Sequence, residues 1–523
     1  MTDPVPASPP AEYNFAEDLL ARHARRASKP AYIDDRAELT YGALNERVRR
    51  FAAGLESLGL RREERMLLLA HDTMDWPVAF LGALYAGVVP VAVNTLLTPD
   101  DYAYMLAHSR ARAAVIAGSL LPTLRQAMAK ARHELTSLVV IRQADEARDT
   151  LAFETLLSAA AAQHAAPTLA DDTAFWLYSS GSTGRPKGTV HTHGNLYWTD
   201  ALYGRQVLGL RENDVVYSAA KLFFAYGLGN ALTFPLSAGA TTVLLPDRPT
   251  PAAVFQQLTA RRATVFFGVP TLYGAMLASP DLPARDRVAL RLAVSAGEAL
   301  PRDIGERFTA HFGCEILDGI GSTEMLHIFL SNRAGNVRYG TTGVPVPGYD
   351  IELRGDDGRP VRDGDIGDLY VRGPSAALMY WCNRDKSRAT FQGEWTRSGD
   401  KYVRDADGYY VYSGRGDDML KVSGQWVSPF EVEAALMRHP AVLEAAVIGR
   451  SDADGLMRTK AFVVLKPGRA GDGSLEDELK TFVKDKLAPF KYPRYVEFVA
   501  ELPKTATGKI QRFRLREREN AAH

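Results

Sequence analysis

The sequence offers little with which to cross-link the chain or to bind a structural metal. It contains two cysteines, Cys314 and Cys382, whose spacing matches no metal-binding motif. A disulfide framework is therefore excluded, and a reducing compartment, the cytoplasm, is expected. Net charge is also absent, because 62 basic side chains balance 62 acidic ones. Such a chain is not expected to bind nucleic acid or anionic membranes through its overall field, although clustered Lys and Arg can hold a local polyanion.

The N-terminus lacks a secretory signal, since no basic start followed by an apolar core is present there. One uncharged stretch, residues 76–93, approaches membrane-spanning length, but prolines and glycines interrupt it. Gly87 is a helix-ending residue, so the stretch predicts a buried helix to about Tyr85 and a strand over 88–93. We therefore expect a buried core segment and no membrane partner.

The order of apolar patterns predicts an α/β fold. Amphipathic helical segments alternate with short β-branched runs, and the absence of a repeat of roughly 20–50 residues argues against a solenoid. This alternation is typical of mainly parallel sheets with helices on both faces. A helix is expected over 41–58, and strands are expected over 65–69, 113–116, 137–141, 241–245 and 264–267. Ala-rich residues 144–170 are expected to form a weakly specified surface connection.

The pattern of predicted elements changes after residue 350, where short strands replace the alternation of helices and strands. Asp-Gly turns at 357–358, 363–364 and 407–408 separate short strands there. This pattern is typical of a small antiparallel or barrel-like module.

The last hundred residues predict a compact α+β domain. Ser428 and Pro429 open a helix as its N-cap and first helical residue. Strands over 442–448 and 460–465 and a helix over 475–487 are expected to follow. Because a polar, Gly-containing turn at 416–418 separates two apolar regions, we expect an N-terminal domain of residues 1–416 and a C-terminal domain of residues 417–523.

The strongest local motif is Tyr-Ser-Ser-Gly-Ser-Thr-Gly-Arg-Pro-Lys-Gly at 178–188. Its glycines, hydroxyls and two cations follow an apolar, strand-like run, and such a loop can wrap phosphate oxygens. It is not a Walker A loop, because Gly-Lys-Ser/Thr does not follow at the required distance. A plain Gly/Ser turn is the alternative. The residues expected to contact phosphate are Ser179, Ser180, Gly181, Ser182, Thr183, Gly184 and Lys187.

Four further motifs follow in order, at 318–324, 396–400, 413–421 and 502–510. Together with the phosphate loop they resemble the motif set of the adenylate-forming superfamily, which includes acyl-CoA synthetases, peptide-synthetase adenylation domains and luciferases. The resemblance spans essentially the whole chain. It implies ATP and Mg²⁺ as ligands and no redox cofactor.

Side-chain chemistry agrees with the roles that this resemblance implies. Glu324 supplies a hard carboxylate oxygen suited to Mg²⁺ that bridges nucleotide phosphates. Thr323 can donate its hydroxyl near the α-phosphate. Asp400 offers two acceptors to the ribose hydroxyls, and Arg415 is a permanent cation for ribose or phosphate.

The resemblance also implies an adenine site. Its expected residues are Gly297, Glu298 and Ala299, followed by Asp318, Gly319, Ile320, Gly321 and Ser322. Ile320 departs from the family pattern, because relatives usually carry an aromatic residue there. An aliphatic side chain can cover a base, but aromatic stacking is lost.

The C-terminal motif contains Lys509, which by resemblance is the catalytic lysine that neutralises charge on the carboxylate and α-phosphate. The family implies that the C-terminal domain rotates about a hinge at Asp417 between two half-reactions. That rotation would bring Lys421, Ser423 and Gly424 to the CoA tunnel. Acetylation of Lys509 would remove its charge, so an acetyltransferase and a deacetylase are candidate partners.

Two aromatic-rich segments, 221–230 and 325–330, resemble those of benzoate–CoA ligases from aromatic-degrading bacteria. By that resemblance the aryl-acid pocket is lined by Ala225, Tyr226, His327 and Ile328. The implied function is AMP-forming ligation of benzoate, or a close analogue, to CoA through an aroyl-adenylate. A general base is not needed, because an aryl acid with a pKa of about 4 is already ionised at neutral pH.

Three other functions compete with this prediction. An adenylation enzyme would deliver the acyl group to a carrier protein in trans, since the sequence ends without a carrier domain. A luciferase-like oxygenase would share the adenylation step. A non-catalytic nucleotide sensor would have little reason to combine Lys509 with Glu324. A homodimer is compatible with the sequence.

Overall fold

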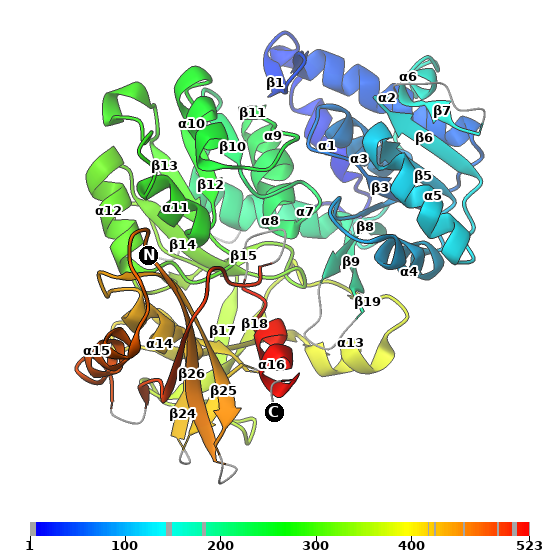
Figure 1. Ribbon diagram of the computed structural model, residues 1–523. Coiled ribbons are helices and arrows are strands. Elements are labelled where there is room, and N and C mark those ends of the chain that lie inside the picture. Colours follow the sequence, from blue (N-terminus) through cyan, green and yellow to red (C-terminus); the bar gives the residue numbers. More distant parts are fainter. Residues whose placement is uncertain are drawn as a thin grey trace.

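The computed structural model describes residues 7–142, 149–179, 185–416, 418–422, 425–452, 456–488, 491–504 and 510–521. Two large sheets covered by helices occupy the upper half of Figure 1, and smaller β-rich units lie beneath them. The predicted α/β class is therefore confirmed.

The first large sheet has eight strands in the order β19-β9-β8-β4-β3-β5-β6-β7. Strands β8, β4, β3, β5, β6 and β7 are parallel to one another. Strands β9 and β19 add an antiparallel edge beside β8. The bounds are β3 Arg65–Leu69, β4 Val89–Ala92, β5 Ala113–Ala117, β6 Ser137–Ile141, β7 Leu151–Ala152, β8 Thr173–Ser179, β9 Lys187–Thr192 and β19 Met379–Tyr380. The strands expected over 65–69, 113–116 and 137–141 are confirmed.

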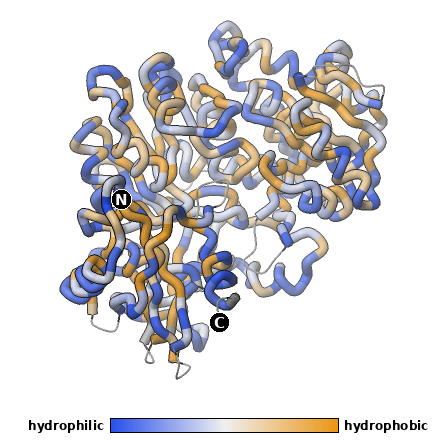
Figure 2. The backbone as a smooth tube through the Cα atoms, viewed as in Figure 1, coloured by the Kyte–Doolittle hydropathy of each residue, from blue (hydrophilic) through white to orange (hydrophobic). Residues whose placement is uncertain are grey.

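Burial on both faces explains the continuous apolar runs of this sheet. In β3, Met66 and Leu68 pack into one hydrophobic core while Leu67 and Leu69 pack into another. Figure 2 shows such hydrophobic strands inside and hydrophilic residues on the surrounding segments.

Two helices, α2 (Tyr41–Ser57) and α3 (Asp75–Tyr85), cover one face of the sheet and confirm the helices expected there. Gly82 of α3 lets them approach closely, because a Cβ atom at this position would lie 2.7 Å from the Phe51 ring of α2. Among the described helices, none combines the length and hydropathy needed to traverse a bilayer.

The second large sheet has nine strands in the order β16-β15-β14-β13-β12-β10-β11-β1-β2, mostly parallel with antiparallel edges. Its bounds are β1 Pro30–Ile33, β2 Glu38–Thr40, β10 Val215–Ser218, β11 Thr241–Val243, β12 Val265–Gly268, β13 Leu292–Ser295, β14 Ile316–Gly321, β15 Ile328–Ser331 and β16 Val344–Pro345. Strands β11 and β12 confirm the predictions for 241–245 and 264–267 to within two residues.

Helices cover these sheets and connect their strands (Figure 1). They are α1 Phe15–Ala21, α4 Pro99–Ser109, α5 Leu121–Lys130, α6 Phe153–Leu156, α7 His193–Thr199, α8 Ala225–Leu228, α9 Phe234–Ala238, α10 Pro251–Ala260, α11 Pro270–Leu277 and α12 Arg302–Phe312. Two π-helical segments, η3 (Asp200–Leu208) and η4 (Gly229–Thr233), continue α7 and α8. π-Helical turns are rare and are frequent at functional sites.

The module predicted after residue 350 is an antiparallel five-stranded sheet, as expected. Its strands are β17 Asp350–Arg354, β18 Ile366–Arg372, β20 Phe391–Gln392, β21 Trp395–Arg404 and β22 Tyr410–Arg415, with α13 (Arg384–Thr390) beside them. It carries Asp400 and Arg415.

The described residues after 418 have hydrophobic cores of their own. The elements are β23 Leu420–Val422, β24 Gln425–Val427, α14 Pro429–Leu436, β25 Val442–Ser451, β26 Met457–Leu465, α15 Gly473–Lys484, β27 Tyr495–Phe498 and α16 Arg512–Ala521. Ser428 caps α14 by accepting a hydrogen bond from the backbone N–H of Glu431, as predicted. Phe430 of α14 packs edge-on against Tyr412 of β22.

One prediction needs correction. The described part of the 144–170 segment, residues 149–170, is not merely a surface connection, because it contains β7 and α6. Phe153, Leu156 and Leu157 are buried in the core beneath α2. The high alanine content of the segment concealed these three buried residues.

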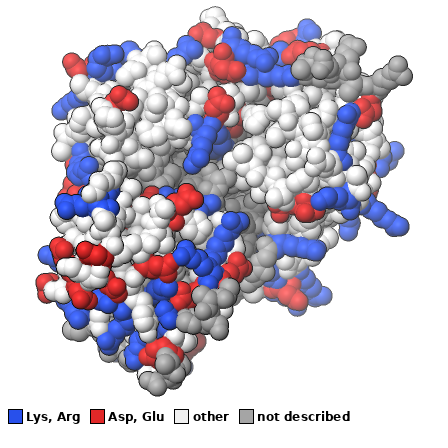
Figure 3. Space-filling model, in the orientation of Figure 1, with Lys and Arg blue, Asp and Glu red and all other residues white. Residues whose placement is uncertain are grey.

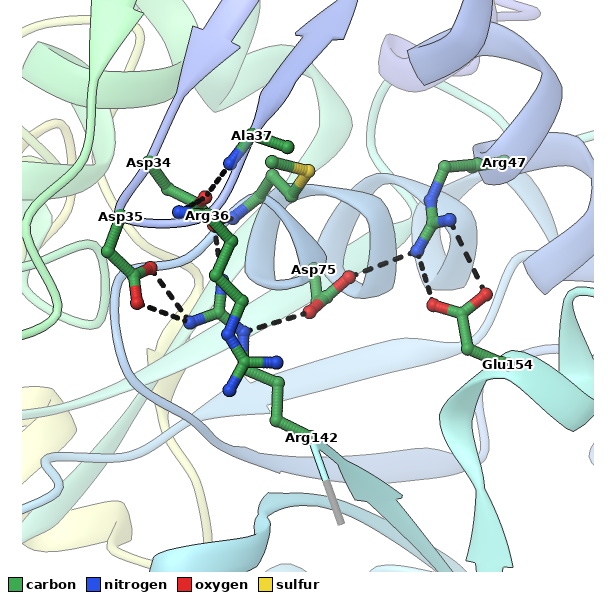
Figure 4. A network of polar contacts seen from close by, with 9 residues as sticks. Asp34, Asp35, Arg36, Ala37, Arg47, Asp75, Arg142 and Glu154 are labelled. Carbon is green, nitrogen blue, oxygen red and sulfur yellow. Dashed lines mark hydrogen bonds and ion pairs between the residues drawn. The ribbon is translucent and has the colours of Figure 1, made fainter. Parts of the chain in front are cut away.

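A network of ion pairs joins the two large sheets (Figure 4). Arg142, just after β6, pairs with Asp34 and Asp35 in the β1–β2 turn and lies 3.7 Å from Asp75 at the start of α3. Arg47 of α2 pairs with Asp75 at 3.0 Å and with Glu154. The Asp34 side chain is completely buried, so its charge depends on these partners.

Candidate active site

Glu324 lies where the two large sheets meet. It follows β14 of the nine-stranded sheet, and three side chains of the eight-stranded sheet face it. Oε1 of Glu324 accepts a hydrogen bond of 2.6 Å from the Tyr380 hydroxyl and one of 3.4 Å from Ser179 Oγ. The Lys187 ammonium lies 3.9 Å from the same oxygen. The phosphate-loop residues Ser179 and Lys187 therefore meet the predicted metal ligand.

Lys187 also contacts Tyr380. Its ammonium donates to the Tyr380 hydroxyl at 3.2 Å and lies 4.4 Å from the centre of the ring. Burial lowers the pKa of Lys187, Glu324 opposes that shift, and the charge of Arg415 adds to the lowering. Arg415 thus lies near enough to act electrostatically on this cluster.

The loop that carries Thr323 and Glu324 is fixed by hydrogen bonds from the eight-stranded sheet. Nε2 of His191 lies 2.8 Å from the Thr323 carbonyl oxygen, and Asn195 lies 2.9 Å from Nδ1. Burial lowers the pKa of His191 to about 4, so the ring is neutral at pH 7. Nε2 therefore carries the proton, donates to Thr323 and holds the loop in place.

The residues predicted to form the adenine site leave adjacent strands at the same sheet edge. Asp318, Gly319, Ile320 and Gly321 end β14, which pairs with β13 through Asp318 and Ser295. Gly297, Glu298 and Ala299 follow β13, and Gly297 has a φ of 95°. Ser322 accepts a hydrogen bond from the Met325 backbone N–H in the next turn. Ligands of open α/β sheets bind at such carboxyl-terminal edges.

Asp318 itself is buried at this edge. Burial raises the pKa of its carboxyl well above the ordinary value. Gly321 admits no side chain, because a Cβ atom there would lie 2.5 Å from the His327 carbonyl oxygen.

Asp400 and Arg415 form a cross-strand pair between β21 and β22, with Arg415 Nη1 3.3 Å from Asp400 Oδ1. Asp400 is buried and Arg415 is exposed. Gly399, with a φ of 83°, turns the chain just before Asp400. The predicted ribose acceptor and the cation predicted to contact ribose or phosphate therefore stand side by side.

Two of the predicted acyl-pocket residues, Tyr226 and His327, are in direct contact, and the other two are their neighbours in sequence. Ala225 and Tyr226 start α8, and Ile328 starts β15 directly after the histidine. Nε2 of His327 lies 3.3 Å from the Tyr226 carbonyl oxygen and 3.2 Å from Asn230 Oδ1. Burial lowers the pKa of His327 to about 3, so its ring is neutral and Nε2 carries the proton.

Aromatic rings complete the surroundings of His327. Tyr226, Tyr203 and Phe234 place their ring centres 5.6, 5.2 and 4.6 Å from its own. The Tyr226 hydroxyl donates to the backbone carbonyls of Gly268 and Val294, both at 3.3 Å. Such a wall suits a flat, apolar ring.

Several residues that contact the predicted ones were missed by sequence reasoning. They are Tyr380, His191, Tyr203, Asn230 and Phe234, and Asn195 in turn contacts His191. The positions of Tyr203 and Asn230 on π-helical segments η3 and η4 left no periodic signal in the sequence.

Some predicted residues lie outside the described ones. They are Ser180, Gly181, Ser182, Thr183, Gly184, Asp417, Ser423, Gly424 and Lys509. Lys421 is described only by its backbone, in β23.

A Mg²⁺ ion held mainly by nucleotide phosphates and water needs only one or two protein carboxylates. Glu324 can supply this carboxylate. The protein groups that contact it approach Oε1, so its other oxygen can serve the ion. The residues present therefore fit the ion that the motifs imply.

Figure 3 shows both signs of charge mixed over one face, in agreement with the zero net charge.

Comparison with known proteins places this geometry in a family. The AMP-binding enzyme family matches residues 20–381, and the AMP-binding enzyme C-terminal domain matches residues 431–509. The chain belongs to the AMP-binding enzyme family. Within this family, the benzoate–CoA ligase of Thauera aromatica is 57% identical over 512 residues, which cover 97% of this chain and 96% of the relative.

Two solved structures of AMP-binding enzymes are also similar. A benzoate CoA ligase from Burkholderia xenovorans LB400 is 63% identical with a TM-score of 0.91, covering 96% of this chain and 100% of that one. An anthranilate CoA ligase in complex with anthranoyl-AMP is 42% identical with a TM-score of 0.94, covering 98% of each chain.

Proposed function

We propose that this chain is an AMP-forming aryl-acid:CoA ligase that acts on benzoate. The observation that carries the proposal is its 57% identity, across nearly the whole chain, with the Thauera aromatica benzoate–CoA ligase. The neutral His327 enclosed by aromatic rings supports a flat aryl acid as the substrate.

Two half-reactions follow from this assignment. In the first, the benzoate oxygen attacks the α-phosphorus of ATP, and the bond from that phosphorus to pyrophosphate breaks. In the second, the CoA thiolate attacks the acyl carbon, and the bond from that carbon to AMP breaks. Mg²⁺, when bound, neutralises phosphate charge.

The chain's own residues position the reactants and oppose charge. We assign Lys187 and Ser179, with the loop that follows, to the phosphates. Asp400 is assigned to the ribose, Arg415 to the ribose or a phosphate, and Thr323 to the α-phosphate.

A pyrophosphate-release assay with benzoate, with and without CoA, tests the proposed function. We expect at most about one turnover without CoA, and continuous release with benzoyl-CoA formation when CoA is present. Release without CoA consumption would favour delivery to a carrier protein, and oxygen uptake would favour an oxygenase. Absence of release under all conditions would reject a ligase and favour a nucleotide sensor.

We further propose a domain boundary at residues 416 and 417 with Asp417 as the hinge. The separate hydrophobic core after residue 418 supports this boundary. The same proposal includes contact of Lys421, Ser423 and Gly424 with CoA. A cytoplasmic location, a homodimer and reversible acetylation of Lys509 are further parts of the proposal, testable by fractionation, light scattering and mass spectrometry.

Asp417→Pro should impair thioester formation more than adenylation, because proline fixes φ near about −65° and opposes rotation at this position. Single-turnover assays of the two half-reactions, with benzoyl-AMP supplied for the second, provide the measurement. Equal loss of both reactions in a folded variant would point to a different hinge.

Ala225→Leu should shrink the acyl pocket. We expect kcat/KM for benzoates with bulky ring substituents to fall relative to unsubstituted benzoate by about tenfold or more, because even one methylene in an apolar site has an effect of about this size. The KM for ATP should stay within about twofold of the wild-type value. Ala252→Leu, an exposed change on α10, is the matched control. An unchanged acid ranking combined with lost ATP binding would contradict the pocket assignment.

A further inference from the structure

The two carboxylate oxygens of Glu324 have different surroundings. Tyr380, Ser179 and Lys187 all approach Oε1. Of the residues that the structure describes, none makes a hydrogen bond or ion pair with Oε2. The protein therefore holds the carboxylate from one side.

The shortest of these contacts comes from Tyr380. Its hydroxyl donates to Oε1 at 2.6 Å and accepts a hydrogen bond from the Lys187 ammonium at 3.2 Å. The cation polarises the hydroxyl toward the carboxylate, and hydrogen bonds to charged groups are stronger than neutral ones.

The position of Tyr380 is fixed independently of Glu324. The residue lies in β19, where it pairs with Thr189 of β9, and its backbone N–H donates to Ser387 Oγ at 3.0 Å. Its ring packs 5.3 Å from the ring of Phe391, and the residue is buried. A hydroxyl held in this way can orient a neighbouring carboxylate.

We propose that Tyr380 is a positioning residue. Its hydrogen bond occupies Oε1 of Glu324 and leaves Oε2 to bind the Mg²⁺ of bound MgATP. This role deepens the nucleotide half of the proposed function and rests on it. The Tyr380 hydroxyl does not itself contact the metal. Its removal should free the carboxylate to rotate, so that the metal contact loses its preset geometry.

Tyr380→Phe tests the role, because it removes the hydroxyl and keeps the ring. Mn²⁺ serves as the probe, titrated by electron paramagnetic resonance in the presence of α,β-methylene-ATP. We expect the Mn²⁺ dissociation constant to rise by about 10-fold or more, as for other partners that orient metal ligands. Binding of the analogue in EDTA should stay within about twofold of wild type, because the metal-free nucleotide does not depend on Oε2.

Two matched variants sharpen the comparison. Ser179→Ala removes the longer, 3.4 Å hydrogen bond from the same oxygen and should weaken Mn²⁺ binding less. Tyr409→Phe removes a hydroxyl from the β21–β22 turn and should change nothing. In a Glu324→Gln background, Tyr380→Phe should have no further effect on Mn²⁺, because the two side chains act through one contact.

Wild-type Mn²⁺ affinity in a folded Tyr380→Phe variant would overturn the inference. Equal weakening of analogue binding with and without metal would also overturn it, because that result indicates general damage to the site. The readout does not involve the acyl substrate. If the wild-type enzyme failed to form benzoyl-CoA, the proposed function would fail while the Mn²⁺ comparison remained decisive for Tyr380.

Discussion

Replacement of Lys509 by alanine should slow formation of benzoyl-AMP by a factor on the order of 10²–10³, the loss typical of one donor that stabilises transition-state charge. The ammonium is proposed to act while negative charge develops between the carboxylate and the α-phosphate. Thioester formation from supplied benzoyl-AMP and CoA should fall much less, because that step is proposed to occur after the C-terminal domain has rotated. Single-turnover assays of the two half-reactions measure both effects.

Lys504 provides the control for Lys509. It lies in the same C-terminal segment and pairs with Glu444 of β25. Lys504→Ala removes an equal charge and should leave both half-reactions close to wild type. If Lys509→Ala impaired both half-reactions equally while circular dichroism stayed unchanged, the alternating role of Lys509 would be rejected.

Arg142→Met should lower the free energy of unfolding of the N-terminal part by about 3 kcal/mol, the lower end of the range for breaking a buried ion pair. The lower end applies because the Arg142 side chain is 18% exposed, whereas that of Asp34 is fully buried. The substitution leaves the Asp34 charge buried with backbone donors alone and removes one of two cations near Asp75. Calorimetry should show the first unfolding transition several degrees lower.

The loss of unfolding free energy in Arg142→Met should depend on pH, because Asp75 can take up a proton. Burial raises the pKa of Asp75, and Arg47 and Arg142 oppose that shift. Without Arg142 the pKa of Asp75 should rise further, so protonation at lower pH relieves the buried charge. The difference from wild type should therefore shrink as pH falls from 7 towards 5. Arg248→Met, an exposed change before α10, should have no comparable effect at any pH. A loss that grew on acidification would contradict the explanation.

The sequence predicted the elements whose signals are local. Strand β3 reads as an uninterrupted apolar run, and the helical period of α2 defines that helix to within one residue. The motif residues Ser179, Lys187 and Glu324 were predicted to act together, and they do lie together.

The missed residues depend on tertiary contacts. Tyr380 reaches Glu324 only because β19 pairs with β9 at the edge of the eight-stranded sheet. Asn230 reaches His327 from a π-helical turn, whose period differs from that of an α-helix. Neither relation leaves a pattern within one stretch of sequence, so a single sequence could not reveal them.

The register between β8 and β9 fixes the two ends of the predicted phosphate motif relative to each other. Ser179 stands opposite Lys187 in the antiparallel ladder, and this pairing belongs to the sheet. The backbone pairing of the two strands therefore sets the distance between these two positions. A substitution of either side chain should leave the other in its place beside Glu324.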